Sequence, residues 1–217
     1  KSPTAVFSRA AERFAARFRS DGGRSGQNIT EGIMVTLAPA APHERNALRR
    51  LYLDAFPRAE RKPFRLLCRQ ARRGRMELLT LRGEAGEPLG LAVTMLHESL
   101  VLLDYFAVDP AARGGGIGGE ALGLLRERYA GRRFFLEIEA LGEPDTPPEQ
   151  ETLRARRKAF YLRNGMRAPG VRACIFGQQM ELLTADGLPV TAAEYRAVYR
   201  RGAGRLAALL IRPQIIE

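Results

Sequence analysis

Five glycines stand close together in the segment Arg113-Gly-Gly-Gly-Ile-Gly-Gly119, directly after an apolar run that stops at Pro110. Where a strand passes through glycines into a helix, backbone N–H groups can point at an anion, and the positive end of the helix dipole adds to the attraction. Phosphate is the natural ligand of such a segment, because any side chain there would stand between the backbone and the anion. A tight strand-to-helix turn without a ligand is the alternative.

Two common phosphate-binding motifs do not fit this segment. No Gly-Lys-Ser or Gly-Lys-Thr follows, so the segment is not a Walker loop. Gly114–Gly116 also lacks the remainder of a dinucleotide fingerprint, with its acidic residue about 20 positions later. The glycines therefore indicate an anion site of another kind.

The elements that must position this segment alternate from Met34 onward. Hydrophobic periodicity and turn residues predict strands in seven places: Val35–Leu37, Glu77–Leu81, Leu89–Met95, Val101–Val108, Phe134–Ala140, Val171–Phe176 and Met180–Leu183. They predict helices over His43–Phe56, Phe64–Arg72, Ala121–Tyr129 and Thr152–Asn164, and a last helix that opens with the capping box Thr191-Ala-Ala-Glu194. The Gly- and Pro-rich segment Gly142–Pro148 is expected to be irregular.

Two motifs on this framework resemble the GNAT N-acetyltransferase superfamily. Arg113-Gly-Gly-Gly-Ile-Gly118 has the Arg/Gln-x-x-Gly-x-Gly form of that superfamily's acetyl-CoA pyrophosphate loop, and Phe160-Tyr-Leu-Arg-Asn-Gly-Met166 is similar to its Phe-Tyr-x-x-x-Gly-Phe signature. The order of strands and helices also follows the GNAT layout over about 150 residues from Met34. Leu136–Glu139, the proline-rich loop and Arg156–Tyr161 further resemble a group of bacterial GNAT proteins.

The resemblance implies an α/β fold with a mixed, mostly antiparallel central sheet, splayed central strands and flanking helices. It also implies that acetyl-CoA is the cosubstrate; with two cysteines and two histidines far apart, no metal is expected. The exposed backbone of Phe106, Ala107 and Val108 would pair with the pantetheine arm. The pyrophosphate would lie on the backbone amides of the glycine loop, with Gly119 beginning the helix. The residues of that loop are Arg113, Gly114, Gly115, Gly116, Ile117 and Gly118.

Tyr161 matches the GNAT tyrosine that lies near the CoA sulfur. There a tyrosine can protonate the departing thiolate, for which an ordinary pKa near ~10 is suitable. Phe160, Tyr161 and Met166 could instead be core residues near a helix end. This chain also departs from the family pattern, since it has Arg154 where Asn is frequent and Met166 where Phe is usual, and the first departure leaves the cofactor contact of that helix open.

Acetyl transfer to an amine also needs a group that accepts a proton from the ammonium. Glu137 and Glu139 share one face of an apolar strand, where acids are costly unless they are paired or open onto a cleft. Glu137 is therefore the candidate general base or the anchor of a cationic substrate. In the alternative, both glutamates pair with nearby arginines, of which Arg132, Arg154, Arg156 and Arg157 are the candidates. Asp104 is a second candidate base.

Other acidic residues and histidines are weaker candidates for catalysis. Asp109 precedes Pro110 and is typical of a turn. His43 and His97 fit surface or core positions better than catalytic ones.

Composition limits the class of protein. A chain of 217 residues with 45% hydrophobic residues suits one main domain, and no apolar run approaches the ~18 residues of a membrane span. The two cysteines, Cys68 and Cys174, lie far apart, which favours a reducing cytoplasm over a disulfide framework or a zinc site. The formal net charge of +11 permits a nucleic-acid partner, but basic residues occur along the whole chain and a general compositional bias explains them better.

Residues 1–33 differ from the rest, with an amphipathic Arg- and Phe-containing stretch followed by a Gly-, Ser- and Asn-rich loop. We expect them to be an extension or leader, with the GNAT-like acetyltransferase domain over 34–217. The sequence thus predicts an acetyl-CoA-dependent N-acetyltransferase, a monomer or homodimer, that modifies a primary amine of a small molecule, peptide or protein. A toxin-type GNAT that acetylates aminoacyl-tRNA and a non-catalytic acyl-CoA-binding module are the alternatives.

Overall fold

The computed structural model describes residues 35–58, 60–175, 177–204 and 214–216. The extension expected over 1–33 lies outside these residues. Eight strands form one sheet in the order β1-β2-β3-β4-β5-β7-β6-β8. They are β1 (Thr36–Pro39), β2 (Met76–Arg82), β3 (Pro88–His97), β4 (Leu100–Val108), β5 (Arg133–Glu139), β6 (Arg172–Ile175), β7 (Gln178–Thr184) and β8 (Gln214–Ile216).

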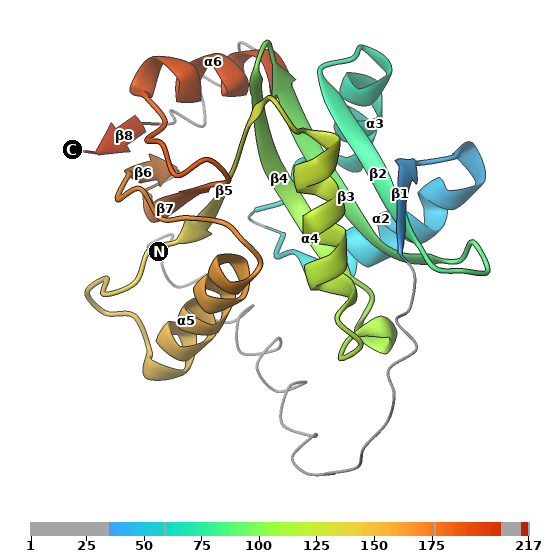
Figure 1. The fold of residues 1–217 in the computed structure, drawn as a ribbon, viewed down its shortest axis with the longest axis horizontal. Helices are drawn as coiled ribbons and strands as arrows, with labels where there is room; N and C mark the ends of the chain where they lie inside the picture. Colours follow the sequence, from blue (N-terminus) through green and yellow to red (C-terminus); the bar gives the residue numbers. More distant parts are fainter. Residues whose placement is uncertain (1–34, 59, 176, 205–213, 217) are drawn as a thin grey trace.

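The sheet is antiparallel except at its centre, where β4 and β5 run parallel. These two strands pair only from Leu100↔Arg133 to Leu103↔Leu136. Beyond that point β4 pairs with β3 alone and β5 pairs with β7 alone. Figure 1 shows the two strands leaving a common point and running apart. The expected mixed sheet with splayed central strands is therefore confirmed.

Helices cover both faces of this sheet (Figure 1). The helices are α2 (Arg45–Ala55), α3 (Phe64–Arg72), α4 (Ile117–Arg128), α5 (Pro148–Arg163) and α6 (Ala192–Gly202), with short 3-10 turns η1 (Pro42–Glu44) and η2 (Pro110–Ala112). Side chains of α2, α3 and α6 share one hydrophobic core with Leu102 and Phe135. Side chains of α4 and α5 share the second core with Leu103 and Leu136. Neighbouring residues of β4 and β5 thus point into different cores, as the two-residue period of a strand requires.

Most expected elements are confirmed, and their differences from expectation lie at the ends. Helix α4 begins at Ile117, with Gly116 as its N-cap, so Gly119 lies inside the first turn and does not begin the helix. Helix α5 begins at Pro148 rather than Thr152, because proline at the first helical position sacrifices no hydrogen bond. Strand β8, which extends the sheet beside β6, was not predicted.

Candidate active site

The divergence of β4 and β5 creates the candidate site. We call this region the fork, which comprises residues 104–108 of β4 and 137–139 of β5. Along the fork, Tyr105–Val108 have partners on β3 only, so the other edge of β4 is left without a strand. An extended ligand arm can therefore add to this edge by backbone hydrogen bonding. Phe106, Ala107 and Val108, the residues expected to pair with pantetheine, all lie on it.

The glycine loop stands at the open end of the fork, between Val108 and α4. The backbone amides from Gly114 to Gly118 donate to no acceptor among the described residues; the first amides bonded within α4 are those of Gly119 and Glu120, both to the Gly116 carbonyl. Consecutive free amides at a helix N-terminus suit a phosphate. The Arg113 guanidinium donates to the Val108 carbonyl over 3.2 Å, which ties the loop to the strand end. These residues therefore fit a pyrophosphate group.

The glycines of the loop serve two purposes. Gly114 and Gly116 have φ values of 96° and 80°, which favour glycine, and both face open space. Gly118 and Gly119 instead allow α4 to approach α5. A Cβ at Gly118 would lie 3.3 Å from the Phe160 ring, and one at Gly119 would lie 2.5 Å from the side-chain oxygen of Asn164. The sequence motif therefore combines an anion site with a close helix contact, and the second purpose was not predicted.

Two carboxylates lie at the narrow end of the fork. Asp104 and Glu137 directly follow Leu103 and Leu136, the last residues that pair β4 with β5. Since residues at equal positions of parallel strands point to the same face, both carboxylates point toward α2 and α6. Asp104 is also the extra residue of a β-bulge, because Val93 pairs with Tyr105 while Thr94 pairs with Leu103.

Glu137 is half-buried, and its carboxylate accepts hydrogen bonds from the Tyr199 hydroxyl of α6 at 2.8 and 3.0 Å. Burial raises the pKa of Glu137 to about 7, more than the neighbouring hydroxyls of Tyr195 and Tyr199 and the Lys62 ammonium lower it. The Tyr195 hydroxyl is itself buried and has no hydrogen-bond partner within the described part of the chain. Glu137 can therefore exchange a proton near neutral pH.

Asp104 has a different environment, because its partner is a cation. The Lys62 ammonium lies 2.7 Å from one carboxylate oxygen and 3.0 Å from the other. Burial raises the pKa of Asp104, and the adjacent Lys62 charge opposes this rise. The ammonium also lies 5.0 Å from the ring centroid of Tyr105 and 5.9 Å from that of Tyr199. The Lys62 ammonium thus balances the charge of the Asp104 carboxylate. Glu137, which has no such ion pair among the described residues, is the better candidate for the base.

Lys62 and Tyr199 belong to the site but were missed in the sequence. The signal for Lys62 was its residue type: this chain has 35 lysines and arginines, of which only Lys1, Lys62 and Lys158 are lysine. Tyr199 carried a weaker signal, since Tyr195 and Tyr199 are four residues apart and share one face of a predicted helix.

The salt-bridged alternative is correct for Glu139 and wrong for Glu137. Glu139 pairs with Arg157 at 2.7 Å and with Arg154 at 3.3 Å. Arg154 is buried and also donates to the Ala140 carbonyl and the Thr146 hydroxyl. Arg154, which stands where Asn is frequent in the GNAT pattern, therefore holds the segment between β5 and α5 in place.

Tyr161 lies on the opposite side of the sheet from Glu137. It is half-buried on α5, stacks edge-on against Phe160 and packs with the core of α4, to which Met166 also belongs. Burial raises the pKa of Tyr161, and Arg157 opposes the rise. The tyrosine thus keeps its proton at neutral pH. Tyr161 packs against the same hydrophobic core as Phe106 and Val108, the half-buried residues of the fork.

Other candidates lie away from the fork. His43 is exposed, and Asp109 accepts from the Ala111 amide as a turn residue. No group of three metal-ligating side chains occurs among the residues that the structure describes. Each described helix is too short or too polar to cross a membrane.

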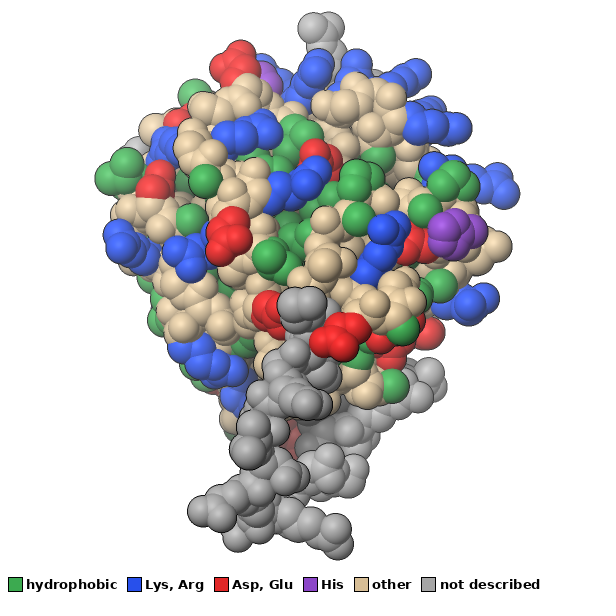
Figure 2. All heavy atoms as spheres, turned by 45° about the vertical axis from the view of Figure 1, so that its right-hand side comes forward, with side chains coloured by type: hydrophobic (Ala, Val, Ile, Leu, Met, Phe, Trp, Pro, Cys, Tyr) green, Lys and Arg blue, Asp and Glu red, His purple; other side chains and the backbone are tan. Residues whose placement is uncertain are grey.

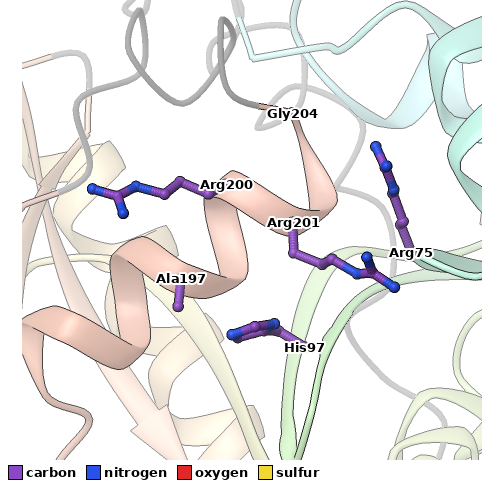
Figure 3. A pocket seen from close by; sticks show the side chains of 6 residues that line it. All are labelled: Arg75, His97, Ala197, Arg200, Arg201 and Gly204. Carbon is purple, nitrogen blue, oxygen red and sulfur yellow. The ribbon is translucent and has the colours of Figure 1, made fainter.

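A basic hollow of about 600 Å³ lies between α6 and the adjoining ends of β2 and β3. His97 lines it together with Arg75, Ala197, Arg200, Arg201 and Gly204. Figure 3 shows Arg75 and Arg201 on the same side of α6, while Arg200 extends away from them. On the face in Figure 2, basic side chains follow one another along the upper right edge, while over the rest of the face they lie in separate groups with acidic side chains between them. That face therefore carries no single continuous basic surface.

No family model and no curated protein sequence matches this chain. Solved structures do match it. A protein from Bacteroides thetaiotaomicron assigned to the GNAT acetyltransferase family matches with a TM-score of 0.61 and 19% identity, over 78% of this chain and 99% of that chain.

Two further matches have described substrates. The ribosomal-protein-S18-alanine N-acetyltransferase of Escherichia coli gives a TM-score of 0.52 at 17% identity, over 70% of this chain and 92% of that one. The spermidine N-acetyltransferase of Vibrio cholerae, solved with CoA and spermine, gives 0.52 at 11% identity, over 69% and 94%. Together with the fork and the glycine loop, these matches show that the chain has the fold of the GNAT N-acetyltransferase superfamily.

Proposed function

We propose that this protein is an N-acetyltransferase that uses acetyl-CoA to acetylate a primary amine of a small molecule, peptide or protein. The observation that carries the proposal is the arrangement of the fork. Five amides without an acceptor among the described residues stand at its open end, an unpaired strand edge runs along it, and a carboxylate with a pKa of about 7 lies at its narrow end. Two of the matched structures are named as acetyltransferases of spermidine and of a protein alanine, both of which offer an amine.

Different residues along the fork would bind different parts of acetyl-CoA. The amides of 114–118 would hold the pyrophosphate, and the edge of β4 from Val108 toward Asp104 would pair with the pantetheine arm. These four steps along a strand span about 13 Å. The cosubstrate supplies an activated acetyl group, which would then lie near the narrow end of the fork.

Glu137 and Tyr161 would handle the protons of the reaction. Glu137 would accept a proton from the acceptor ammonium, directly or through water, and its pKa of about 7 leaves a substantial fraction ionised at neutral pH. Tyr161, on the α4 and α5 side, would donate a proton to the departing sulfur. The two groups belong to different faces of the sheet, so they would act from opposite sides of the fork.

A matched pair of glycine variants tests the cosubstrate site. Gly116 and Gly86 both have φ of 80° and face open space, but Gly86 lies in the turn between β2 and β3. Gly116→Asp should abolish the rise in melting temperature that CoA causes, because its carboxylate would repel the pyrophosphate. Gly86→Asp imposes the same backbone conformation and should keep that rise. An unchanged CoA effect in Gly116→Asp would contradict the proposed site.

Release of CoA thiol in the presence of a panel of amines tests catalysis itself. We expect thiol release above the background of slow hydrolysis with at least one polyamine or peptide amine. A rise in melting temperature with CoA, without thiol release by any amine, would instead favour the acyl-CoA-binding module.

An amine carried by a polyanion is a second candidate acceptor. The basic hollow is lined by α6, the helix that supplies Tyr199 to the fork. An aminoacyl-tRNA bound there would lie beside the face of the sheet that carries Glu137, which we call the acceptor side. Such binding should weaken steeply with salt. Arg201→Glu should then abolish tRNA retention while CoA binding persists. Retention that is insensitive to salt and to this variant would exclude this acceptor.

A further inference from the structure

Only two lysines occur among the described residues, and both form ion pairs. Lys158 of α5 pairs with Glu181 at 2.8 Å, and its side chain is 26% exposed. Lys62 pairs with Asp104 at 2.7 Å, and its side chain is 16% exposed. An arginine could serve either pair, and this chain uses arginine almost everywhere else. A lysine differs in one respect that matters for acyl transfer, since its amine becomes a nucleophile when it loses a proton.

The position of Lys62 is fixed by its backbone as well as its charge. Its carbonyl accepts from the Tyr52 hydroxyl at 3.0 Å, and its amide donates to the Tyr105 hydroxyl at 3.1 Å. The Tyr105 hydroxyl in turn donates to the Glu60 carbonyl at 2.8 Å. These bonds fasten the segment before α3 to β4, and the side chain of Lys62 then extends to the narrow end of the fork.

The ammonium of Lys62 thus stands where the proposed function requires an acceptor amine. It contacts Asp104, the first residue of β4 beyond the pairing with β5, and the ring of Tyr199. The hydroxyl of the same Tyr199 donates to Glu137. A nucleophile, a proton acceptor and the expected end of the pantetheine arm therefore meet in one place.

We propose that Lys62 is a self-acetylation site, to which the chain transfers the acetyl group of acetyl-CoA within the same molecule. This inference rests on the proposed function, because it needs the thioester at the narrow end of the fork. It goes beyond that function by naming an acceptor within the chain. The modified Lys62 would lose its charge and its ion pair with Asp104.

The step balances as an ordinary acyl transfer. The Lys62 ammonium gives one proton to Glu137, and the neutral Nζ attacks the thioester carbonyl carbon. A C–N bond forms, the C–S bond breaks, and the nitrogen loses its second proton. One of the two protons leaves with the thiol and the other passes to water, so each acetyl-lysine formed yields one CoA thiol and one proton. The ion pair with Asp104 opposes the first proton loss, so we expect one slow event per chain.

Peptide mapping can separate the two lysines. The full chain is incubated with acetyl-CoA, without any other amine, and is then cleaved after glutamate. Lys62 lies in the peptide 61–77 and Lys158 in the peptide 152–181, and neither peptide holds a second lysine. We expect one acetyl group on 61–77, formed with a first-order rate constant that does not change with protein concentration, and much slower modification of 152–181.

Two variants accompany this measurement. Glu137→Gln should slow acetylation of 61–77 by roughly 10²–10⁴-fold, as expected for loss of a general base, while background modification of 152–181 stays unchanged. Lys62→Arg should leave 61–77 unmodified. Its CoA-induced rise in melting temperature should persist, since the glycine loop is intact.

Three results would overturn the proposal. Equal or faster modification of the more exposed Lys158 would indicate direct chemical acetylation by acetyl-CoA. A rate constant that rises with protein concentration would indicate transfer between molecules. An unmodified 61–77 in a preparation that acetylates an external amine would refute self-acetylation while leaving the proposed function intact. Failure of the proposed function would look different, with no CoA-induced rise in melting temperature and no thiol release by any amine.

Discussion

Replacing Glu137 by glutamine tests whether the ionised carboxylate of this residue lowers the free energy of unfolding. Its pKa of about 7, against an ordinary 4.5, means that the folded protein binds its proton more tightly than the unfolded chain does. The carboxylate then contributes most favourably to stability below pH 4.5, and this contribution is lost as the pH rises to about 7. The difference corresponds to about 3 kcal/mol above that pH, as an upper value for a half-buried group.

Glutamine at this position is neutral at every pH, and its amide oxygen can still accept from the Tyr199 hydroxyl. Glu137→Gln should therefore raise the free energy of unfolding by up to about 3 kcal/mol near pH 8, with the gain shrinking toward zero near pH 4.5. Urea unfolding of the two proteins across this pH range measures the effect. The same variant should lower turnover by roughly 10²–10⁴ and remove an acidic limb of the pH–rate profile centred near pH 7.

Glu139→Gln is the matched control on the same strand. Its carboxylate is paired with Arg154 and Arg157, so the variant should lose stability or leave it unchanged near pH 8. A Glu137→Gln protein that is no more stable than the parent near pH 8, or equally stabilised at both ends of the pH range, would refute our account of this carboxylate. Retained turnover with a verified acceptor would refute its role as the base.

Three further variants test other parts of the site. Tyr161→Phe should lower turnover by roughly 10²–10⁴ and leave CoA affinity intact in a thermal titration, because the glycine loop holds the pyrophosphate; weakened CoA binding would point to a packing role instead. Lys62→Met should lower the free energy of unfolding by about 3–5 kcal/mol near pH 8 and by less as the pH falls, because burial raises the pKa of Asp104 and favours its neutral form; a loss that does not change with pH would contradict the buried ion pair. Arg154→Met should destabilise the fold through Glu139 and the segment before α5, and a protein of parental stability in urea unfolding would contradict its structural role.

The order of the strands and helices could be predicted from the sequence, because the central elements have clear hydrophobic periodicity and are bounded by turn residues. Strand β8 could not, since Gln214–Ile216 has three residues and gains its order from pairing with β6. Window-based patterns do not register so short a segment. The glycine loop was predictable as an anion site, but the role of Gly118 and Gly119 depends on how close α5 approaches, which is a tertiary property.

The acceptor side of the site was harder to predict for a related reason. Lys62, Asp104, Glu137 and Tyr199 come from four separate elements, and no spacing in the sequence links them. Asp104 and Glu137 stood out in the sequence because acids in apolar strands are unusual. A base and a salt-bridged residue could not be told apart there, since Glu137 and Glu139 look alike in sequence while their neighbours in space differ.

The β-bulge at Asp104 explains how one strand can serve both sides of the fork. Leu103 belongs to the core of α4, so strict alternation would direct Asp104 toward α2 and α6 and Tyr105 back toward α4. The extra residue at the bulge breaks this alternation, and Tyr105 packs instead in the core of α2 and α6. Asp104 and Tyr105 therefore both face Lys62, which contacts the carboxylate of one and the ring of the other. Alternation then resumes, and Phe106 and Val108 face the α4 and α5 side, where Tyr161 lies. Without the bulge, the Lys62 ammonium would lose the Tyr105 ring and keep only that of Tyr199. Phe106 and Val108 would then face α2 and α6 instead of α4 and α5.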